Sequence, residues 1–339
     1  MQSPPKPPRR GGRPGRDVAF SLPNTTNPAL MNENERRAMT DKSPPVGTYQ
    51  TLEPGIRRIL APNPSPMTYW GTNTYVLGQG EVVVLDPGPN LAPHLDAILT
   101  GLEPGEQISK ILVTHAHLDH SPLATPLSQA TGAPIYAFGN AQAGRSDVMR
   151  DLVARGLSSG GEGVDVDFTP DIILSDGDVV HHNGLDIETI WTPGHFANHL
   201  SFCMNGPTFT GDHVMALASS LVSPPDGDLT AFMASCEKLR IRDDRIYYPG
   251  HGAPIVNPAE RINWLIHHRK TREADILNAL GNGQAHTITS LTQNIYTETP
   301  TALLPAAERN VFAHLIDLYE RDLVRAKPTL DVSADFFRL

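Results

Sequence analysis

Short apolar segments alternate with turn residues over residues 51–256 of the chain. Each segment has the length of a β-strand, and most are bounded by Gly, Pro, Asn or Asp, which favour turns. A stretch with helical spacing, residues 92–102, separates two of the segments. This alternation predicts a layered α/β domain. The predicted strands are residues 74–77, 82–85, 111–113, 135–138, 185–190, 200–203 and 246–248.

The pattern changes at about residue 257, where apolar residues begin to recur every three or four positions. Residues 258–280 and 307–318 both show this spacing, which predicts helices. Pro258 stands near the start of the first helix, where proline is favoured. We therefore predict a small, mostly helical second domain over residues 257–339.

Residues 1–50 lack any periodic apolar pattern and hold 9 of the 31 prolines. They carry 8 Lys and Arg against 4 Asp and Glu, whereas the rest of the chain carries 19 against 33. We predict a disordered, basic, Pro/Gly-rich extension followed by an acidic body. An acidic body does not attract polyphosphates in general.

The 339 residues, with a net charge of −10 and two cysteines, exclude a disulfide scaffold and a collagen-like chain. No apolar run approaches the roughly 18–20 residues of a membrane span. The N-terminus has no continuous apolar segment typical of a signal peptide. We therefore expect a cytoplasmic protein without a membrane partner; no oligomeric state is indicated.

The strongest chemical feature is the segment His115-x-His117-x-Asp119-His120, which follows the apolar strand at 111–113. In an extended segment His115 and His117 project to the same side, so both imidazoles can bind one metal ion. Asp119 and His120 come one step later, where the chain turns, and can face a second ion. Imidazole and carboxylate are ligand types that zinc accepts.

Three later positions can complete the two metal sites. His195, Asp212 and His251 each follow an apolar strand and a glycine, which lets the backbone approach closely. Any one of these residues alone would be a weak signal. Their combination with the histidine-rich segment, in this order, predicts a metal centre.

These motifs resemble the signature of the metallo-β-lactamase superfamily. The similarity covers roughly residues 55–256 and includes the segments 71–77 and 82–88, which resemble the first two strands of that fold. The resemblance implies an α/β fold, the αββα metallo-β-lactamase sandwich, with a dinuclear metal centre at one edge. Asp86 would then orient a ligand histidine.

The resemblance also implies a ligand for each coordination role. His115, His117 and His195 would hold the first metal ion. Asp119, His120 and His251 would hold the second ion, with Asp212 bridging the two. Zinc is the expected metal, and iron or manganese also suit such ligands.

Residues 267–277, 288–296 and 310–315 resemble the winged-helix-like C-terminal region of the beta-lactamase-like protein 2 group. Some members of that group are single-strand endoribonucleases, and fungal relatives are thioesterases acting on carrier-bound polyketides. The resemblance therefore leaves the substrate open between these two chemistries.

Two metal ions can hold a bridging hydroxide that attacks a carbonyl carbon or a phosphorus atom. No Gly-x-Ser-x-Gly motif provides a serine nucleophile instead. Asp119 is a candidate for steering protons in addition to its role as a ligand. His199 is a candidate either for protonating the leaving group or, as we favour, for hydrogen bonding to a metal ligand. His213 is expected to face away from the site.

The favoured function is a dinuclear zinc hydrolase acting on a small molecule or acyl thioester, a lactone or another ester. Its substrate would be selected by the loops at residues 139–163 and 216–226. A metal-dependent single-strand endoribonuclease is the first alternative, although residues 259–339 hold 9 basic against 10 acidic residues. A non-catalytic metal-binding interaction protein is the second, and the complete ligand set argues against it.

The basic residues of the first C-terminal helix are expected on a solvated face: Arg261, Arg269, Lys270 and Arg272.

Overall fold

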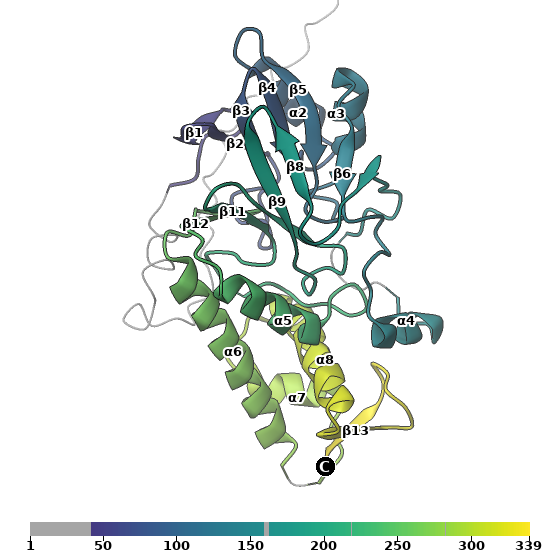
Figure 1. Cartoon of the computed structure of the whole chain (residues 1–339). Coiled ribbons are helices and arrows are strands. Elements are labelled where there is room, and N and C mark those ends of the chain that lie inside the picture. The colour runs from purple at the N-terminus through teal and green to yellow at the C-terminus, as the bar shows by residue number, and fades with distance from the viewer. Residues whose placement is uncertain (1–41, 159–162, 218, 282) are drawn as a thin grey trace, which may run out of the picture.

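The computed structural model describes residues 42–158, 163–217, 219–281 and 283–339 (Figure 1). Most of the predicted extension over residues 1–50 lies outside these ranges. The last residues of that range contact the α/β domain, since Val46 pairs with Leu60 and the Tyr49 hydroxyl donates to the Ile98 carbonyl at 2.8 Å. No helix in the described ranges is long and apolar enough to cross a membrane.

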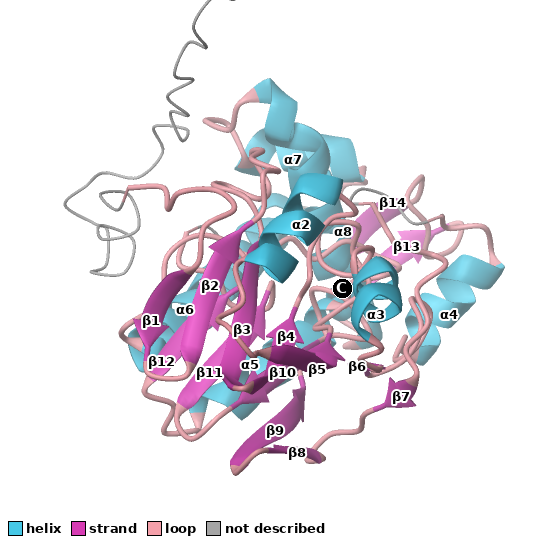
Figure 2. Cartoon of the chain, turned by 90° about the horizontal axis from the view of Figure 1, so that it is seen from above, coloured by secondary structure: helices cyan, strands magenta, loops and turns pink. Residues whose placement is uncertain are grey.

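The first β-sheet has seven strands in the order in which they occur along the chain. Its first four strands are antiparallel neighbours, and β5, β6 and β7 then continue parallel to β4. Figure 2 shows β1 and β7 at opposite ends of this sheet. The strands are β1 (Gln50–Glu53), β2 (Ile56–Leu60), β3 (Asn73–Gln79), β4 (Glu81–Leu85), β5 (Gln107–Leu112), β6 (Ile135–Ala137) and β7 (Ile172–Ile173).

The second β-sheet has five strands in the order β12-β11-β10-β9-β8. It is antiparallel except for β11 and β12, which pair in parallel. The strands are β8 (Val179–His182), β9 (Leu185–Trp191), β10 (Leu200–Cys203), β11 (Pro207–Gly211) and β12 (Ile246–Pro249).

The two sheets pack face to face with helices on both outer faces, as predicted for an αββα sandwich. Side chains such as Tyr75, Leu85, Phe202 and Phe209 from both sheets form the core between them. α2 and α3 cover the outer face of the first sheet, and α5 and α6 pack against the second. These helices are α2 (Ala92–Thr100), α3 (Ala124–Thr131), α5 (Leu229–Arg240) and α6 (Pro258–Ala279).

The C-terminal region forms its own apolar core, to which α4 (Asp147–Ala154) also contributes. Figure 1 shows α7 and α8 beside the distal part of α6. The two strands after α8 pair as an antiparallel hairpin, which was not predicted. The elements are α7 (Ile288–Ile295), the short 3₁₀ helix Thr301–Leu303, α8 (Leu304–Glu320), β13 (Val324–Lys327) and β14 (Asp335–Arg338).

The expectation that the arginines of α6 lie on a solvated face is wrong for two of them. Arg261 is 0% exposed and Arg269 is 3% exposed. Arg261 Nε donates to the Met215 carbonyl at 2.6 Å, and its guanidinium stacks on Trp264 at 4.3 Å. Backbone carbonyls of the neighbouring loop replace water as acceptors, which explains why charged side chains are buried here.

Leu265→Ala is expected to lower the free energy of unfolding by about 2–5 kcal/mol, because Leu265 is fully buried between α6 and the second sheet. Ile241→Ala is the matched control, since Ile241 is 79% exposed, and it should change stability by no more than about 0.5 kcal/mol. Chemical denaturation of both variants measures the difference. Equal stabilities would contradict the packing of α6 against the sandwich.

Candidate metal centre

The predicted ligands come together because the strands that precede them end at one edge of the sandwich. β9 and β11 both run antiparallel to β10 and therefore point the same way, and β12 runs parallel to β11. His195, Asp212 and His251 follow the carboxyl ends of these three strands. The loop after β5 reaches the same edge, where the Leu200 N–H donates to the Thr114 carbonyl at 2.8 Å.

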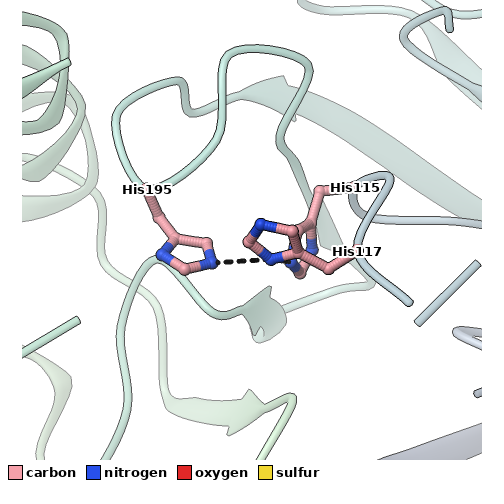
Figure 3. Close-up of side chains that lie close together, drawn as sticks. All are labelled: His115, His117 and His195. Carbon is pink, nitrogen blue, oxygen red and sulfur yellow. Dashed lines mark hydrogen bonds between the residues drawn. The ribbon is translucent and has the colours of Figure 1, made fainter. Parts of the chain in front are cut away.

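The first group of candidate ligands consists of His115, His117 and His195, which are all buried. Nε2 of His115 lies 2.8 Å from Nδ1 of His117, and Nε2 of His195 lies 3.2 Å from the same nitrogen. Figure 3 shows the three rings converging, two from one loop and the third from another. Three imidazole nitrogens that face one point are a common zinc-binding arrangement.

The partners of the opposite ring nitrogens determine where the protons lie in this group. Nδ1 of His195 lies 2.7 Å from the Leu221 carbonyl oxygen, which can only accept, so this nitrogen carries the proton. The Thr114 hydroxyl donates to Asp86 and therefore accepts from Nδ1 of His115 at 2.9 Å. In the neutral rings, both Nε2 atoms consequently direct lone pairs toward the third ring. A bound cation satisfies these lone pairs, so the residues fit a metal ion.

The second group consists of Asp119, His120, Asp212 and His251. Nε2 of His251 lies 3.1 Å from Asp119 Oδ2 and 3.2 Å from Asp212 Oδ2. Nε2 of His120 lies 3.4 Å from Asp212 Oδ1 and 3.3 Å from Nε2 of His251. Asp212 Oδ2 also lies 3.8 Å from Nε2 of His195, so this carboxylate lies between the two groups.

The histidines of the second group also have their far nitrogens engaged. Nδ1 of His251 donates to the Gly71 carbonyl at 3.1 Å, and Nδ1 of His120 donates to the Asp86 carboxylate at 2.9 Å. In the neutral rings, both Nε2 atoms therefore direct lone pairs toward the two carboxylates of the group. Two carboxylates in a buried site require compensating positive charge, either from protons on these rings or from a cation between them. This donor set also fits a divalent metal ion.

The electrostatics of the two groups differ. Burial is the largest cause that lowers the pKa of His117 to about 3 and the pKa of His115 well below its usual value. Both rings are therefore neutral at pH 7, which is the form that binds a metal. Burial also opposes charge on His251, but the carboxylates of Asp212 and Asp119 outweigh it and raise its pKa to about 10. The second group therefore attracts positive charge.

Asp86 fixes the loop that carries the first ligands. Its Oδ1 accepts from the Thr114 N–H at 2.7 Å, and its Oδ2 accepts from the Thr114 hydroxyl at 2.8 Å and from Nδ1 of His120 at 2.9 Å. The prediction that Asp86 orients a candidate ligand is confirmed. Sequence reasoning missed the Thr114 hydroxyl and the carbonyls of Gly71 and Leu221 as partners of the candidate ligands. A backbone carbonyl has no sequence signal, and a single threonine beside the motif is not a distinctive one.

His199 is fully buried, and both of its ring nitrogens have partners inside the protein. Nδ1 pairs with the Thr192 hydroxyl at 2.9 Å, and Nε2 accepts from the Asp212 N–H at 3.2 Å. This geometry supports the role of holding a ligand rather than protonating a leaving group. His213 faces away from the site, as expected, and its Nε2 lies 3.6 Å from Cys236 Sγ.

Glycine is required where the loops that carry the candidate ligands approach one another. A Cβ atom on Gly250 would lie 2.4 Å from Asp212 Oδ1 and 2.6 Å from Cε1 of His120. A Cβ atom on Gly211 would lie 2.6 Å from Nε2 of His199. The prediction that glycines before the ligands permit close approach of the backbone is confirmed at these positions.

The fold and the site define a metal-dependent hydrolase with two candidate metal sites. The Metallo-beta-lactamase superfamily matches residues 67–251, which include every candidate ligand, and the Beta-lactamase associated winged helix domain matches residues 287–330. The chain belongs to the metallo-β-lactamase superfamily, as its resemblance to that family predicted.

Individual proteins extend this similarity to most of the chain. It is 32% identical over 297 residues to the Beta-lactamase-like protein 2 homolog of Drosophila melanogaster, covering 83% of this chain and 93% of that protein. It is 31% identical over 249 residues to the Atrochrysone carboxyl ACP thioesterase of Aspergillus fumigatus, covering 71% and 70%. A β-lactamase domain protein from Burkholderia ambifaria has the same fold, with a TM-score of 0.74, 22% identity and coverage of 91% and 99%.

His117→Ala is expected to lower the metal content of the protein, because it removes one of three nitrogens from the first group. Elemental analysis after dialysis against a limiting chelator measures the bound ions. His181→Ala is the control, since the His181 side chain is 77% exposed and pairs only with the exposed Asp186 among the described residues. Unchanged metal content in His117→Ala would contradict the assignment of this group.

Asp86→Asn is expected to weaken metal binding by roughly 10–100-fold, because an amide cannot accept all three hydrogen bonds that orient Thr114 and His120. Chelator competition measures the affinity. Asp186→Asn, a change of the same chemistry at an exposed carboxylate, should leave the affinity unchanged. Equal affinities in all three proteins would show that Asp86 does not position a ligand.

Proposed function

We propose that this chain is a dinuclear zinc hydrolase of a thioester, a lactone or another ester bond. The observation that carries the proposal is the pair of buried ligand groups with the Asp212 carboxylate between them. The printed name of one relative, a carboxyl ACP thioesterase, supports an acyl thioester as the substrate class.

Each side chain of the centre has a proposed role. His115, His117 and His195 hold the first ion. Asp119, His120 and His251 would hold the second, and Asp212, which lies between the two groups, would contact both. Ions bound at these residues would supply Lewis-acid chemistry, which activates water for attack and stabilises negative charge on the substrate oxygen. Nε2 of His199 accepts a hydrogen bond from the backbone N–H of Asp212 and so positions this ligand.

Asp119 is the candidate ligand with the greatest access to solvent. Its side chain is 26% exposed, compared with 9% for Asp212. The neighbouring Leu118 is 51% exposed. This exposure supports an approach of the substrate from the side of Asp119 and a role for this carboxylate in steering a proton during hydrolysis.

Both loops that we expect to select the substrate contribute to one cavity of about 360 Å³ beside the loop of His195. Its walls include Trp191, Pro193 and Pro225, together with the Arg145–Asp226 ion pair at 2.6 Å. A cavity of this size accommodates a small molecule or the end of an acyl chain.

Two observations disfavour the endoribonuclease alternative. An RNA-binding groove requires accessible basic side chains, but Arg261 and Arg269 of α6 are buried. The C-terminal residues 259–339 also have no net positive charge. The non-catalytic alternative is disfavoured because every predicted ligand is present and lies in one of the two groups.

Zinc is the proposed metal, with iron or manganese as alternatives, because the ligands are imidazoles and carboxylates. A cytoplasmic location fits the two free, buried cysteines, Cys203 and Cys236. Burial raises the pKa of the Cys236 thiol to about 12, so it is protonated and unreactive at neutral pH.

Metal-loaded protein is expected to hydrolyse at least one member of a panel of S-acyl pantetheine thioesters, aryl esters and lactones. His117→Ala should lower kcat/KM by roughly 100-fold or more, because Lewis-acid stabilisation contributes several kcal/mol to the transition state. His181→Ala is again the control and should retain full activity. Release of thiol or acid is followed spectroscopically.

The same proteins are incubated with labelled single-stranded RNA at low salt. No cleavage is expected from the wild type. Cleavage of RNA that His117→Ala abolishes, together with an inactive ester panel, would replace the proposed function with the endoribonuclease alternative.

A further inference from the structure

The segment between Asp212 and α5 passes directly beside the first ligand group. Its Leu221 is 8% exposed, and the Leu221 carbonyl accepts the 2.7 Å hydrogen bond from Nδ1 of His195. This bond determines which nitrogen of His195 is free for a metal and how the ring is turned. The position of the Leu221 carbonyl oxygen therefore determines how His195 is oriented toward His115 and His117.

The residue before Leu221 is held by the C-terminal region. Arg269 of α6 donates from Nη2 to the Ser220 carbonyl, and the Ser220 hydroxyl donates to the His213 carbonyl at 3.1 Å. The guanidinium also lies over the ring of Phe232 at 5.1 Å. Burial of a cation is costly, and here it is offset by neutral acceptors and an aromatic face.

The residue after Leu221 is held by the same region. Oδ1 of Asn310 in α8 accepts from the Val222 N–H at 3.2 Å and from Nη1 of Arg269 at 3.0 Å. Asn310 is itself fixed by a hydrogen bond of 3.3 Å from its Nδ2 to the Ala306 carbonyl. One hydrogen-bonded pair, contributed by two C-terminal helices, therefore contacts the backbone on both sides of Leu221.

We infer that Arg269 and Asn310 are positioning residues for the metal centre: they clamp residues 220–222 and thereby fix the Leu221 carbonyl that orients His195. The C-terminal region, residues 257–339, would then contribute to metal binding without supplying a ligand. The inference rests on the metal centre of the proposed function, but it does not depend on the identity of the substrate.

Arg321 provides a matched control within the same region. It bonds to Glu273 of α6 and to Asp317 of α8, both at 2.8 Å, and so joins the two helices as Arg269 does. Its partners do not include the segment 220–222. Arg321→Met therefore loosens the packing of the C-terminal helices but leaves the Leu221 carbonyl in place.

The test compares the full-length variants Arg269→Met, Asn310→Leu and Arg321→Met with the wild type. Stepwise affinities for zinc are measured by chelator competition, and the absorption spectrum of the cobalt-substituted protein reports ligand geometry. Arg269→Met and Asn310→Leu should weaken binding of one of the two ions by roughly 10–100-fold and alter the cobalt spectrum. Asn310→Asp keeps the accepting oxygen and should restore wild-type values.

Thermal unfolding of each variant separates positioning from general destabilisation. Arg321→Met should lower Tm and leave both affinities and the spectrum unchanged. If Arg269→Met does not fold, Arg269→Lys carries the same test, because an ammonium group keeps the charge but lacks the planar fork that contacts two acceptors.

Wild-type affinities and spectra in the folded variants at both positions would overturn the inference. An equal loss of affinity in Arg321→Met would also overturn it, since the effect would then follow stability. A wild-type protein that binds two ions but hydrolyses no member of the ester panel would contradict the proposed function alone.

Discussion

The structure depends most on a buried cluster of imidazole nitrogens and carboxylate oxygens that face one another. The ring nitrogens of His195 and His251 that face the centre carry no proton when the rings are neutral, because the opposite nitrogens donate to backbone carbonyls. The Asp119 and Asp212 carboxylates point into the same small volume. Without a metal ion, these carboxylates raise the pKa of His251 to about 10, so a proton on this ring supplies the compensating charge. A divalent cation would replace that proton and accept the lone pairs of the surrounding rings.

The fold forms this cluster by ending several strands of like direction at one edge. The sheets supply rigid strand ends, and small residues at Gly211 and Gly250 let the loops that follow come within reach of one another. Hydrogen-bond partners then fix each ring, with Asp86 serving both the Thr114 loop and His120. The metal centre is therefore a property of the whole sandwich rather than of the histidine-rich segment alone.

Much of this organisation could be predicted from the sequence, since the His-x-His-x-Asp-His segment and the later ligands each follow an apolar strand and carry strong local signals. The hydrogen-bond partners that residues find in distant parts of the chain were harder to predict. Arg269 looked like part of a solvated face because its acceptors are the Ser220 carbonyl and Asn310, which are distant in sequence. The hairpin of β13 and β14 was missed because four-residue strands containing charged residues resemble loops.

The most direct measurement is a crystal structure of the metal-loaded protein with anomalous scattering recorded at the edge of the bound metal. We expect two peaks, one among His115, His117 and His195 and the other between Asp119 and His251, with Asp212 contacting both ions. A single peak, or two peaks outside these side chains, would contradict the dinuclear centre on which the proposed hydrolysis depends.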